Sequence, residues 1–323
     1  MLKKLLNTAR IEFDIIPIDP MLIKSSMATV GGVDMSFVRT YKTGRPEPFI
    51  PGSSLKGMIR SYAEKICRSL KDKPVPVCLP YLSPGKEKDG EKHQASCGLR
   101  FDKYKKSKNI QTIPSTDIYL NSCAICKLFG SHEFIGRLST SDGYLKPESK
   151  SLLEIRDGVA IDRITGGAAG GAKYDLEVLT RGEFCTNLEI RNFERWQLAL
   201  IGLVLRDMCQ GYVRLGFGKS RGLGRFKAEV KSFKIGYYNR NFSQLVGIYK
   251  LCTKEEQKQY GFFKESETDT SPISLDYQKG LLNEYDITDT WEEDLEPGVA
   301  DFISMINESQ WPNNLEQFVK GGR

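Results

Sequence analysis

Apolar residues recur with two different periods in the N-terminal part of the chain, and this change of period constrains the fold most. In ARIEFDIIPI (9–18) apolar and polar residues alternate, which is typical of a half-buried strand. Beyond Ser53 and Ser54, either of which can cap a helix, apolar residues recur at helical spacing as far as residue 70. A strand, a Gly-rich loop and a helix therefore follow one another, and this order predicts an α+β fold.

The elements that follow extend this pattern. Residues 71–150 are rich in Lys, Pro, Ser and Gly and indicate an irregular insertion, whereas 155–182 predict a protruding hairpin of two extended arms with a Gly/Ala tip. FCTNLEI then predicts a strand, ERWQLALIGLVLRDMC a helix, and the residues up to 236 a last strand. The order β-α-(insertion)-hairpin-β-α-β matches a ferredoxin-like (RRM-like) βαββαβ unit.

Charge divides the chain into two parts. Residues 237–323 hold 16 Asp and Glu against 8 Lys and Arg, a net charge of −8, while residues 1–236 hold 39 Lys and Arg against 25 Asp and Glu, a net charge of +14. A basic region of this kind suits a polyanionic partner, of which nucleic acid is the commonest. A solvated surface with excess Lys is the alternative. We expect an RNA-binding domain over 1–236 and an acidic extension over 237–323.

Nothing in the sequence predicts a membrane segment or export. The longest apolar run, LALIGLVL (198–205), is far shorter than the roughly 20 residues that span a bilayer. The N-terminus has no apolar h-region, so a cytoplasmic location is expected. Eight Cys in a cytoplasmic chain favour metal binding or buried thiols over disulfides.

Four residues have the spacing of a zinc site. NSCAICKLFG contains a Cys-x2-Cys knuckle, and EKHQASC adds a His-x3-Cys pair; together these would give tetrahedral ligands. Cys78 is an alternative to the histidine, and a redox Cys-x-x-Cys is the rival interpretation, although it leaves the second pair unused. The predicted zinc ligands are His93, Cys97, Cys123 and Cys126.

The glycine-rich segments do not form a nucleotide-binding P-loop. In RLGFGKSRGLGRF the glycine spacing differs from GxxxxGK[ST], and a strand follows instead of a helix. What remains is a loop with Lys219, Arg221 and Arg225 on a flexible backbone that could lie close to phosphates. A plain hairpin turn is the other interpretation.

GGVDMSFVRT places Asp34 directly after two glycines and shortly before Arg39. An Asp beside Gly is most often a turn former. A carboxylate near basic residues can also deprotonate or orient a ribose 2′-OH, or position a divalent ion for phosphodiester cleavage. The next helix has Lys56 and Arg60 on its polar face, and its N-terminus could bind an anion.

Five motifs in order, SSMATVGGVD, IPGSSLKGMIR, CAICKLFG, RDGVAIDRITGGAAGGAKYDLEVL and GFGKSRGLGRF, resemble those of the RAMP superfamily. The chain looks most similar to the backbone subunits of type III CRISPR effector complexes. The resemblance covers about residues 8–236. The acidic extension is not part of this pattern, and its presence suggests a specialised position in a complex of non-identical subunits, as in type III-D-like systems.

The resemblance implies a palm, a zinc-binding insertion and a thumb hairpin that wedges into a guide–target duplex. It implies that Asp34 is essential for cutting target RNA through metal-dependent attack of the target's own 2′-OH, with a divalent cation such as Mg²⁺. It also implies three partners: guide RNA, target RNA and other effector subunits. The implied RNA-binding residues are Ser53, Ser54, Lys56, Arg39, Arg60, Val159, Ile161, Arg163, Lys219 and Arg221.

Two other functions stay open at this point. The chain could be a purely structural guide-RNA-binding subunit in which Asp34 is a turn residue. It could also be a stand-alone guide-processing ribonuclease, although such enzymes usually rely on His, and both His93 and His132 lie in or beside the predicted metal loop.

Overall fold

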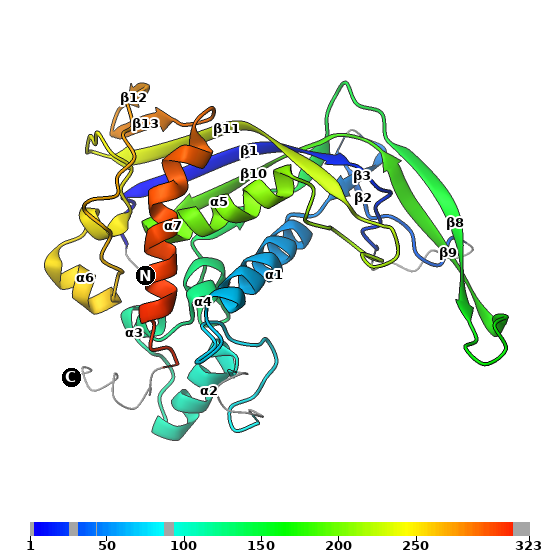
Figure 1. Ribbon diagram of the computed structural model, residues 1–323, viewed down its shortest axis with the longest axis horizontal. Helices are drawn as coiled ribbons and strands as arrows, with labels where there is room; N and C mark the ends of the chain where they lie inside the picture. Colours follow the sequence, from blue (N-terminus) through cyan, green and yellow to red (C-terminus); the bar gives the residue numbers. More distant parts are fainter. Residues whose placement is uncertain (1–2, 26–31, 43, 87–93, 313–323) are drawn as a thin grey trace.

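A computed structural model describes residues 3–25, 32–42, 44–86 and 94–312, which form a mixed α+β fold around a large antiparallel sheet (Figure 1). The sheet is centred on β1 (Asn7–Pro17), which pairs antiparallel with β10 (Phe184–Arg191) and β11 (Phe226–Tyr238). Alternate β1 side chains, from Ala9 to Ile15, are buried. The predicted strand at 9–18 is therefore confirmed, and its buried face carries the core.

The remaining strands extend this sheet on both sides. The order of its strands is β12-β13-β11-β1-β10-β7-β3-β2, and β6 also pairs with β10. These outer strands are β2 (Arg39–Tyr41), β3 (Pro46–Ile50), β6 (Leu138–Thr140), β7 (Gly143–Leu145), β12 (Tyr277–Lys279) and β13 (Leu282–Asp286). A separate two-stranded sheet joins β4 (Gly130–Ser131) and β5 (Phe134–Ile135).

Two long helices lie against one face of the sheet, and both agree with the predicted helices (Figure 1). They are α1 (Gly52–Leu70) and α5 (Arg195–Cys209). The predicted Ser cap of α1 is wrong, because Pro51 occupies the N-cap and no side chain caps the helix there. Instead Gly52 N–H donates to Asp142 Oδ1 at 2.7 Å. A Cβ on Gly52 would lie 2.9 Å from Ser141 backbone atoms, so glycine permits this close approach.

The segment 71–150 is more regular than its sequence indicates. It contains α2 (Cys97–Lys108), α3 (Ser115–Leu120) and α4 (Ala124–Phe129), and its β6 and β7 belong to the main sheet. Two of the helices span only six residues, too few for apolar periodicity to be recognised. Tertiary packing of buried residues, such as Ile118 in α3 and Phe129 in α4, stabilises these two helices.

The acidic extension is not separate from the basic part, and the expected boundary at 236/237 falls inside β11. Beyond β11 lie η1 (Ile248–Leu251), α6 (Lys254–Tyr260), β12, β13 and α7 (Trp291–Glu308). β13 pairs with β11, and α7 packs across α5, where buried Arg195 Nε lies 2.5 Å from Asp301 Oδ2 (Figure 1). The difference in net charge comes mainly from surface residues and does not mark a domain boundary. One apolar core contains residues from both the basic part and the acidic extension.

The hairpin of β8 (Leu152–Ile161) and β9 (Ala168–Arg181), called the thumb below, projects from the body of the molecule (Figure 1). Its two strands form a sheet of their own. Among the helices of the described residues, none has the length and apolar character needed to cross a bilayer.

Candidate functional site

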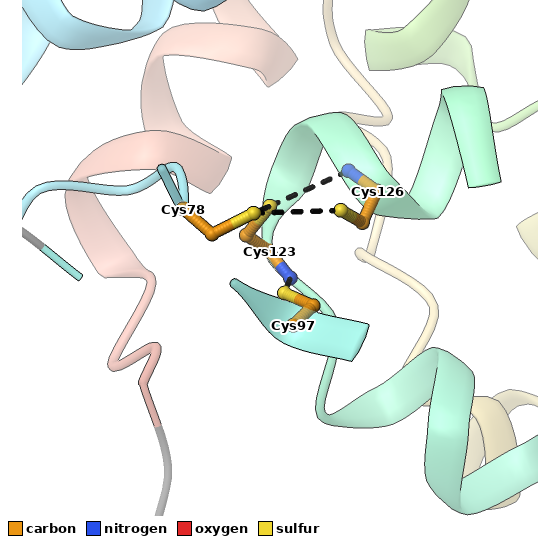
Figure 2. Close-up of side chains that lie close together, drawn as sticks. All are labelled: Cys78, Cys97, Cys123 and Cys126. Atoms are coloured by element: carbon orange, nitrogen blue, oxygen red, sulfur yellow. Dashed lines mark hydrogen bonds between the residues drawn. The ribbon is translucent and has the colours of Figure 1, made fainter. Parts of the chain in front are cut away.

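Four cysteines meet in a buried cluster between α2, α4 and the segment that follows α1 (Figure 2). Cys97 begins α2, Cys123 precedes α4, Cys126 lies in its first turn, and Cys78 approaches from the opposite side. Cys78 Sγ lies 3.6 Å from Cys126 Sγ and 3.7 Å from Cys123 Sγ. Three of the predicted zinc ligands are thus together, and Cys78 is the fourth sulfur. The predicted ligand His93 lies outside the described residues.

The spacing of the sulfurs in the cluster suits a metal site. With Zn–S bonds of about 2.3 Å, the ligand sulfurs of a tetrahedral zinc site lie about 3.8 Å apart, close to the distances found here. Backbone N–H groups of Cys123 and Cys126 donate to Cys97 Sγ at 3.3 Å and Cys123 Sγ at 3.4 Å. Such bonds stabilise thiolates, so the cluster could hold a metal ion such as zinc.

The protonation of the cluster agrees with this interpretation. Burial raises the pKa of the Cys97 thiol well above its usual value. For Cys123 burial acts in the same direction, but hydrogen bonds with the other three cysteines outweigh it and lower the pKa well below its usual value. Four closely packed sulfurs cannot all ionise without a cation, whereas a bound divalent ion requires deprotonated ligands.

Arg60, expected to bind RNA, lies against this cluster. Its guanidinium donates to Cys126 Sγ and the Gly130 carbonyl at 3.4 Å, and it pairs with Glu64 at 3.3 Å. The side chain is half-buried and occupied by these contacts. A positive charge there stabilises thiolates.

Asp34 lies exposed beside the base of the thumb. Its Oδ2 accepts a hydrogen bond from the backbone N–H of Asp175 in β9 at 3.0 Å. The next residue, Met35, forms a parallel bridge with Leu176. Residues 174–177 of β9, called the thumb base below, therefore hold the loop that presents the Asp34 carboxylate.

Arg39 is attached to the same part of β9. Its Nη1 donates to Glu177 Oε2 at 2.9 Å, and that oxygen also accepts from the backbone N–H of Phe37 at 2.9 Å. Glu177 thereby positions both the loop and the guanidinium. Part of the Arg39 charge is neutralised, which leaves less of it for a phosphate.

The glycine-rich loop 216–224 also contacts the thumb base. Arg221 Nη1 donates to the Tyr174 hydroxyl at 2.9 Å, and its guanidinium lies 4.8 Å from the centre of the Phe217 ring. Gly216 adopts φ +88°, and a Cβ there would lie 2.3 Å from the Leu22 carbonyl oxygen, so the loop needs glycine at this position. Asp34 and Arg221, far apart in sequence, are thus both attached to residues 174–177.

The basic residues of α1 and of the loop lie near one another. Burial, and then the neighbouring Lys65 ammonium, lower the pKa of Lys219, which places the loop beside α1. Burial and Arg60 likewise lower the pKa of Lys56. Ser53 is exposed and Ser54 half-buried in the first turn of α1. Like charges brought together in this way attract a polyanion.

The thumb exposes apolar side chains. Val159 is 46% exposed and Ile161 58% exposed on β8, and Arg163 lies exposed in the turn at the tip. Cross-strand packing does not bury these two aliphatic residues. Exposed aliphatic side chains on a projecting hairpin are available to a partner.

Several residues of the site were not predicted. Tyr174, Asp175 and Glu177 make the contacts that hold Asp34, Arg39 and Arg221. Alternation along 173–179 indicates a strand, but only the hairpin register shows which of its residues meet the loop. For His132 the sequence indicates only a place beside the metal loop; its Nε2 lies 2.9 Å from Oδ2 of Asp102, in the middle of α2.

Comparison with known families agrees with these elements. The sequence matches the model of the RAMP superfamily over residues 20–227, which is more than half of the 323 residues. A comparison with curated proteins finds no match. The matched span contains Asp34, the cysteine cluster, the thumb and the loop 216–224. The chain therefore belongs to the RAMP superfamily.

Proposed function

We propose that the protein is a CRISPR-associated backbone subunit that binds guide RNA and, within its complex, cleaves complementary target RNA with Asp34. Membership of the RAMP superfamily supports the RNA-binding role. The resemblance of its motifs to type III subunits supports the more specific role, and the extension after residue 236 supports a specialised, type III-D-like position among other subunits.

The palm of this proposal is the centre of the sheet. The strand order β11-β1-β10-β7, with α1 after β1 and α5 after β10, supports a ferredoxin-like βαββαβ unit. In this scheme the cysteine cluster holds a structural zinc. The zinc would add to the apolar packing of the segment around α2 and α4, since metal binding contributes directly to folding.

The observation that carries the catalytic proposal is the attachment of Asp34 to the thumb base. The Asp34 carboxylate is exposed, and β9 positions the loop that carries it. Strand β9 pairs with β8, which carries the exposed aliphatic residues Val159 and Ile161. A thumb that displaces one target nucleotide would bring the adjoining phosphodiester beside Asp34. Orientation of the reacting groups in this way is one source of rate acceleration in such a site.

The cleavage step needs only the substrate's own nucleophile. The ribose 2′ oxygen attacks the adjacent phosphorus, the bond to the 5′ oxygen breaks and that oxygen takes a proton from water, so the products are a 2′,3′-cyclic phosphate and a 5′-hydroxyl. Asp34 accepts the 2′-OH proton or holds that hydroxyl in line. Basic side chains such as Arg221 and Lys219 stabilise the charge on the phosphate oxygens.

The proposal includes a divalent cation beside Asp34, as the resemblance of the motifs implies, but Asp34, Asp157 and Asp175 do not form one of the compact ligand groups found among the described residues. Asp157 and Asp175 lie opposite each other in the thumb register, and Asp175 Oδ1 has no hydrogen-bond partner among the described residues. The side-chain hydrogen bond with Asp157 raises the pKa of Asp175. Carboxylate oxygens are the donors that Mg²⁺ prefers, and such a cation would supply charge neutralisation at the phosphate.

A second function is favoured by the same hydrogen bond. Because Asp34 accepts from Asp175 N–H, it has a structural role whether or not it takes part in chemistry. The protein would then be a non-catalytic guide-RNA-binding subunit.

The decisive experiment is cleavage of a matched target RNA by the whole complex carrying Asp34→Ala. We expect loss of cuts at the positions served by this subunit, while guide RNA and subunits stay assembled. Asp289→Ala, an exposed carboxylate far along the chain, is the control and should cut normally. Unchanged cleavage by the Asp34→Ala complex would leave the structural role.

A further inference from the structure

A groove with a volume of about 970 Å³ lies in the C-terminal part of the chain, between residues 268–274 and helix α7. It lies beyond the span matched by the RAMP family, which ends at residue 227. Its lining includes a set of aliphatic residues that would suit an apolar ligand surface. These residues are Ile273, Ile287, Pro297, Val299 and Ile303.

Carboxylates also line the groove, and among the described residues of its lining there is no Lys, Arg or His. The acidic residues are Asp269, Asp286, Glu293, Asp294 and Glu296. A lining whose charged residues are all acidic repels RNA and attracts cationic groups. The occupant is therefore of a different chemical kind from the polyanion expected at the thumb base.

Pro297 adds a hydrogen-bond acceptor to the groove. Proline has no N–H, so the carbonyl of Glu293, four residues earlier in α7, lacks its usual helical donor. Both residues line the groove. The following Gly298 packs on α5, where a Cβ would lie 2.9 Å from Ala199 Cβ. A Lys or Arg side chain in the groove could donate to this carbonyl, which lacks the donor that residue 297 would otherwise supply.

Hydrogen bonds hold the two sides of the groove together. Ser271 Oγ, from the segment 268–274, donates to the backbone carbonyl of Asp294 in α7 at 2.6 Å. On α7, Thr290 Oγ1 donates to Asp294 Oδ2 at the same distance. A groove joined in this way is formed before a ligand arrives, which reduces the entropy cost of binding.

From this combination we propose that the groove binds a basic, amphipathic segment of a partner protein. Its Lys or Arg side chains would pair with Glu293 and Glu296, and its aliphatic side chains would cover Ile303, which is 40% exposed. Charge complementarity identifies the occupant: the groove presents carboxylates and an aliphatic surface together. The proposal is independent of whether Asp34 cuts RNA.

The test uses the full-length protein and a fluorescent helical peptide of Leu and Lys arranged on opposite faces, with fluorescence anisotropy at physiological salt. We expect saturable binding that Glu293→Lys/Glu296→Lys weakens by about tenfold, since like charges across an interface are strongly unfavourable. Glu292→Lys is the matched control, because Glu292 is exposed on the same helix but outside the groove. It should change the affinity less than about twofold, as expected of a rim charge.

Pro297→Ala separates binding from folding. Alanine restores the N–H donor to the Glu293 carbonyl and favours the helix, so we expect an unfolding temperature at least as high as that of the wild type, with an affinity about threefold lower because one acceptor is lost.

Three results would overturn the proposal. The first is equal weakening by Glu292→Lys and by the double substitution. The second is equally tight binding of a Lys/Gly peptide without Leu, which would mean that charge alone is recognised. The third is a concentration-dependent dimer that the double substitution abolishes, which would assign the groove to a second copy of this chain.

Discussion

Asp34 Oδ2 and the backbone N–H of Asp175 are joined by a 3.0 Å hydrogen bond, which fastens the loop before α1 to the thumb. Asp34 therefore combines two properties that one substitution can separate: a charge that faces solvent and an acceptor that holds the loop.

Asp34→Asn keeps an oxygen that can accept from Asp175 N–H but removes the charge. If the carboxylate performs chemistry, target cleavage by the complex falls by at least about a hundredfold, the usual contribution of a general acid–base group, while guide-RNA binding stays unchanged. Single-turnover cleavage and guide-RNA affinity are the measurements. Wild-type rates for Asn combined with slow cleavage for Ala would instead assign Asp34 a positioning role.

Cys78→Ser should remove zinc from the purified protein, because Cys78 Sγ lies within 3.7 Å of two other cluster sulfurs. The unfolding temperature should fall steeply, since the zinc-binding free energy of about 10–16 kcal/mol in zinc-finger peptides is also folding free energy. Zinc content by mass spectrometry and thermal unfolding measure both effects.

His93→Ala is the matched variant for the zinc experiment, and it should keep the full zinc content if four cysteines form the site. If Cys78→Ser kept its zinc and His93→Ala lost it, the ligands would be those predicted from the spacing, with His93 in place of Cys78.

Val159→Thr combined with Ile161→Thr should weaken cleavage of target RNA by about tenfold, since burying an aliphatic side chain contributes about 1.5–3 kcal/mol. Threonine keeps the branched shape, and both positions are exposed, so the unfolding temperature should not change. Ile135→Thr, at an exposed site outside the thumb, serves as the control. If the double variant lost cleavage and its unfolding temperature also fell, the two side chains would have a packing role instead.

Glu265 should make the stability of the protein depend on pH. Burial raises its pKa from 4.5 to about 7, and Gly247 N–H donates to its carboxylate at 3.1 Å. Between pH 4.5 and about 7 the folded chain keeps a proton that the unfolded chain releases, so stability falls as pH rises through this window. The total effect is on the order of 3 kcal/mol, at about 1.4 kcal/mol per pKa unit.

Glu265→Gln should remove this dependence and raise the unfolding temperature at pH 8, whereas the exposed Glu267→Gln should not. Urea unfolding at several pH values tests this prediction. Parallel pH profiles for the wild type and Glu265→Gln would contradict it.

Local patterns in the sequence were enough to predict the main strands, the helices α1 and α5 and the arms of the thumb. Each strand or helix must bury one of its faces, and this produces the alternating or helical spacing of its apolar residues. The pattern is therefore visible within the sequence of that one element. The knuckle Cys123 and Cys126 could be predicted for the same reason, since both lie in one turn.

Only the tertiary structure decided which distant residues meet. Cys78 joins the cluster because the chain after α1 passes beside α4, and the acidic extension joins the basic part because β13 pairs with β11 and Asp301 pairs with Arg195. These contacts between distant segments cannot be predicted from the spacing of the cysteines or from the net charge of the two parts. The thumb base likewise unites Asp34 and Arg221 through residues 174 and 175, because strand register, which depends on the whole hairpin and its surroundings, determines contacts between segments far apart in sequence.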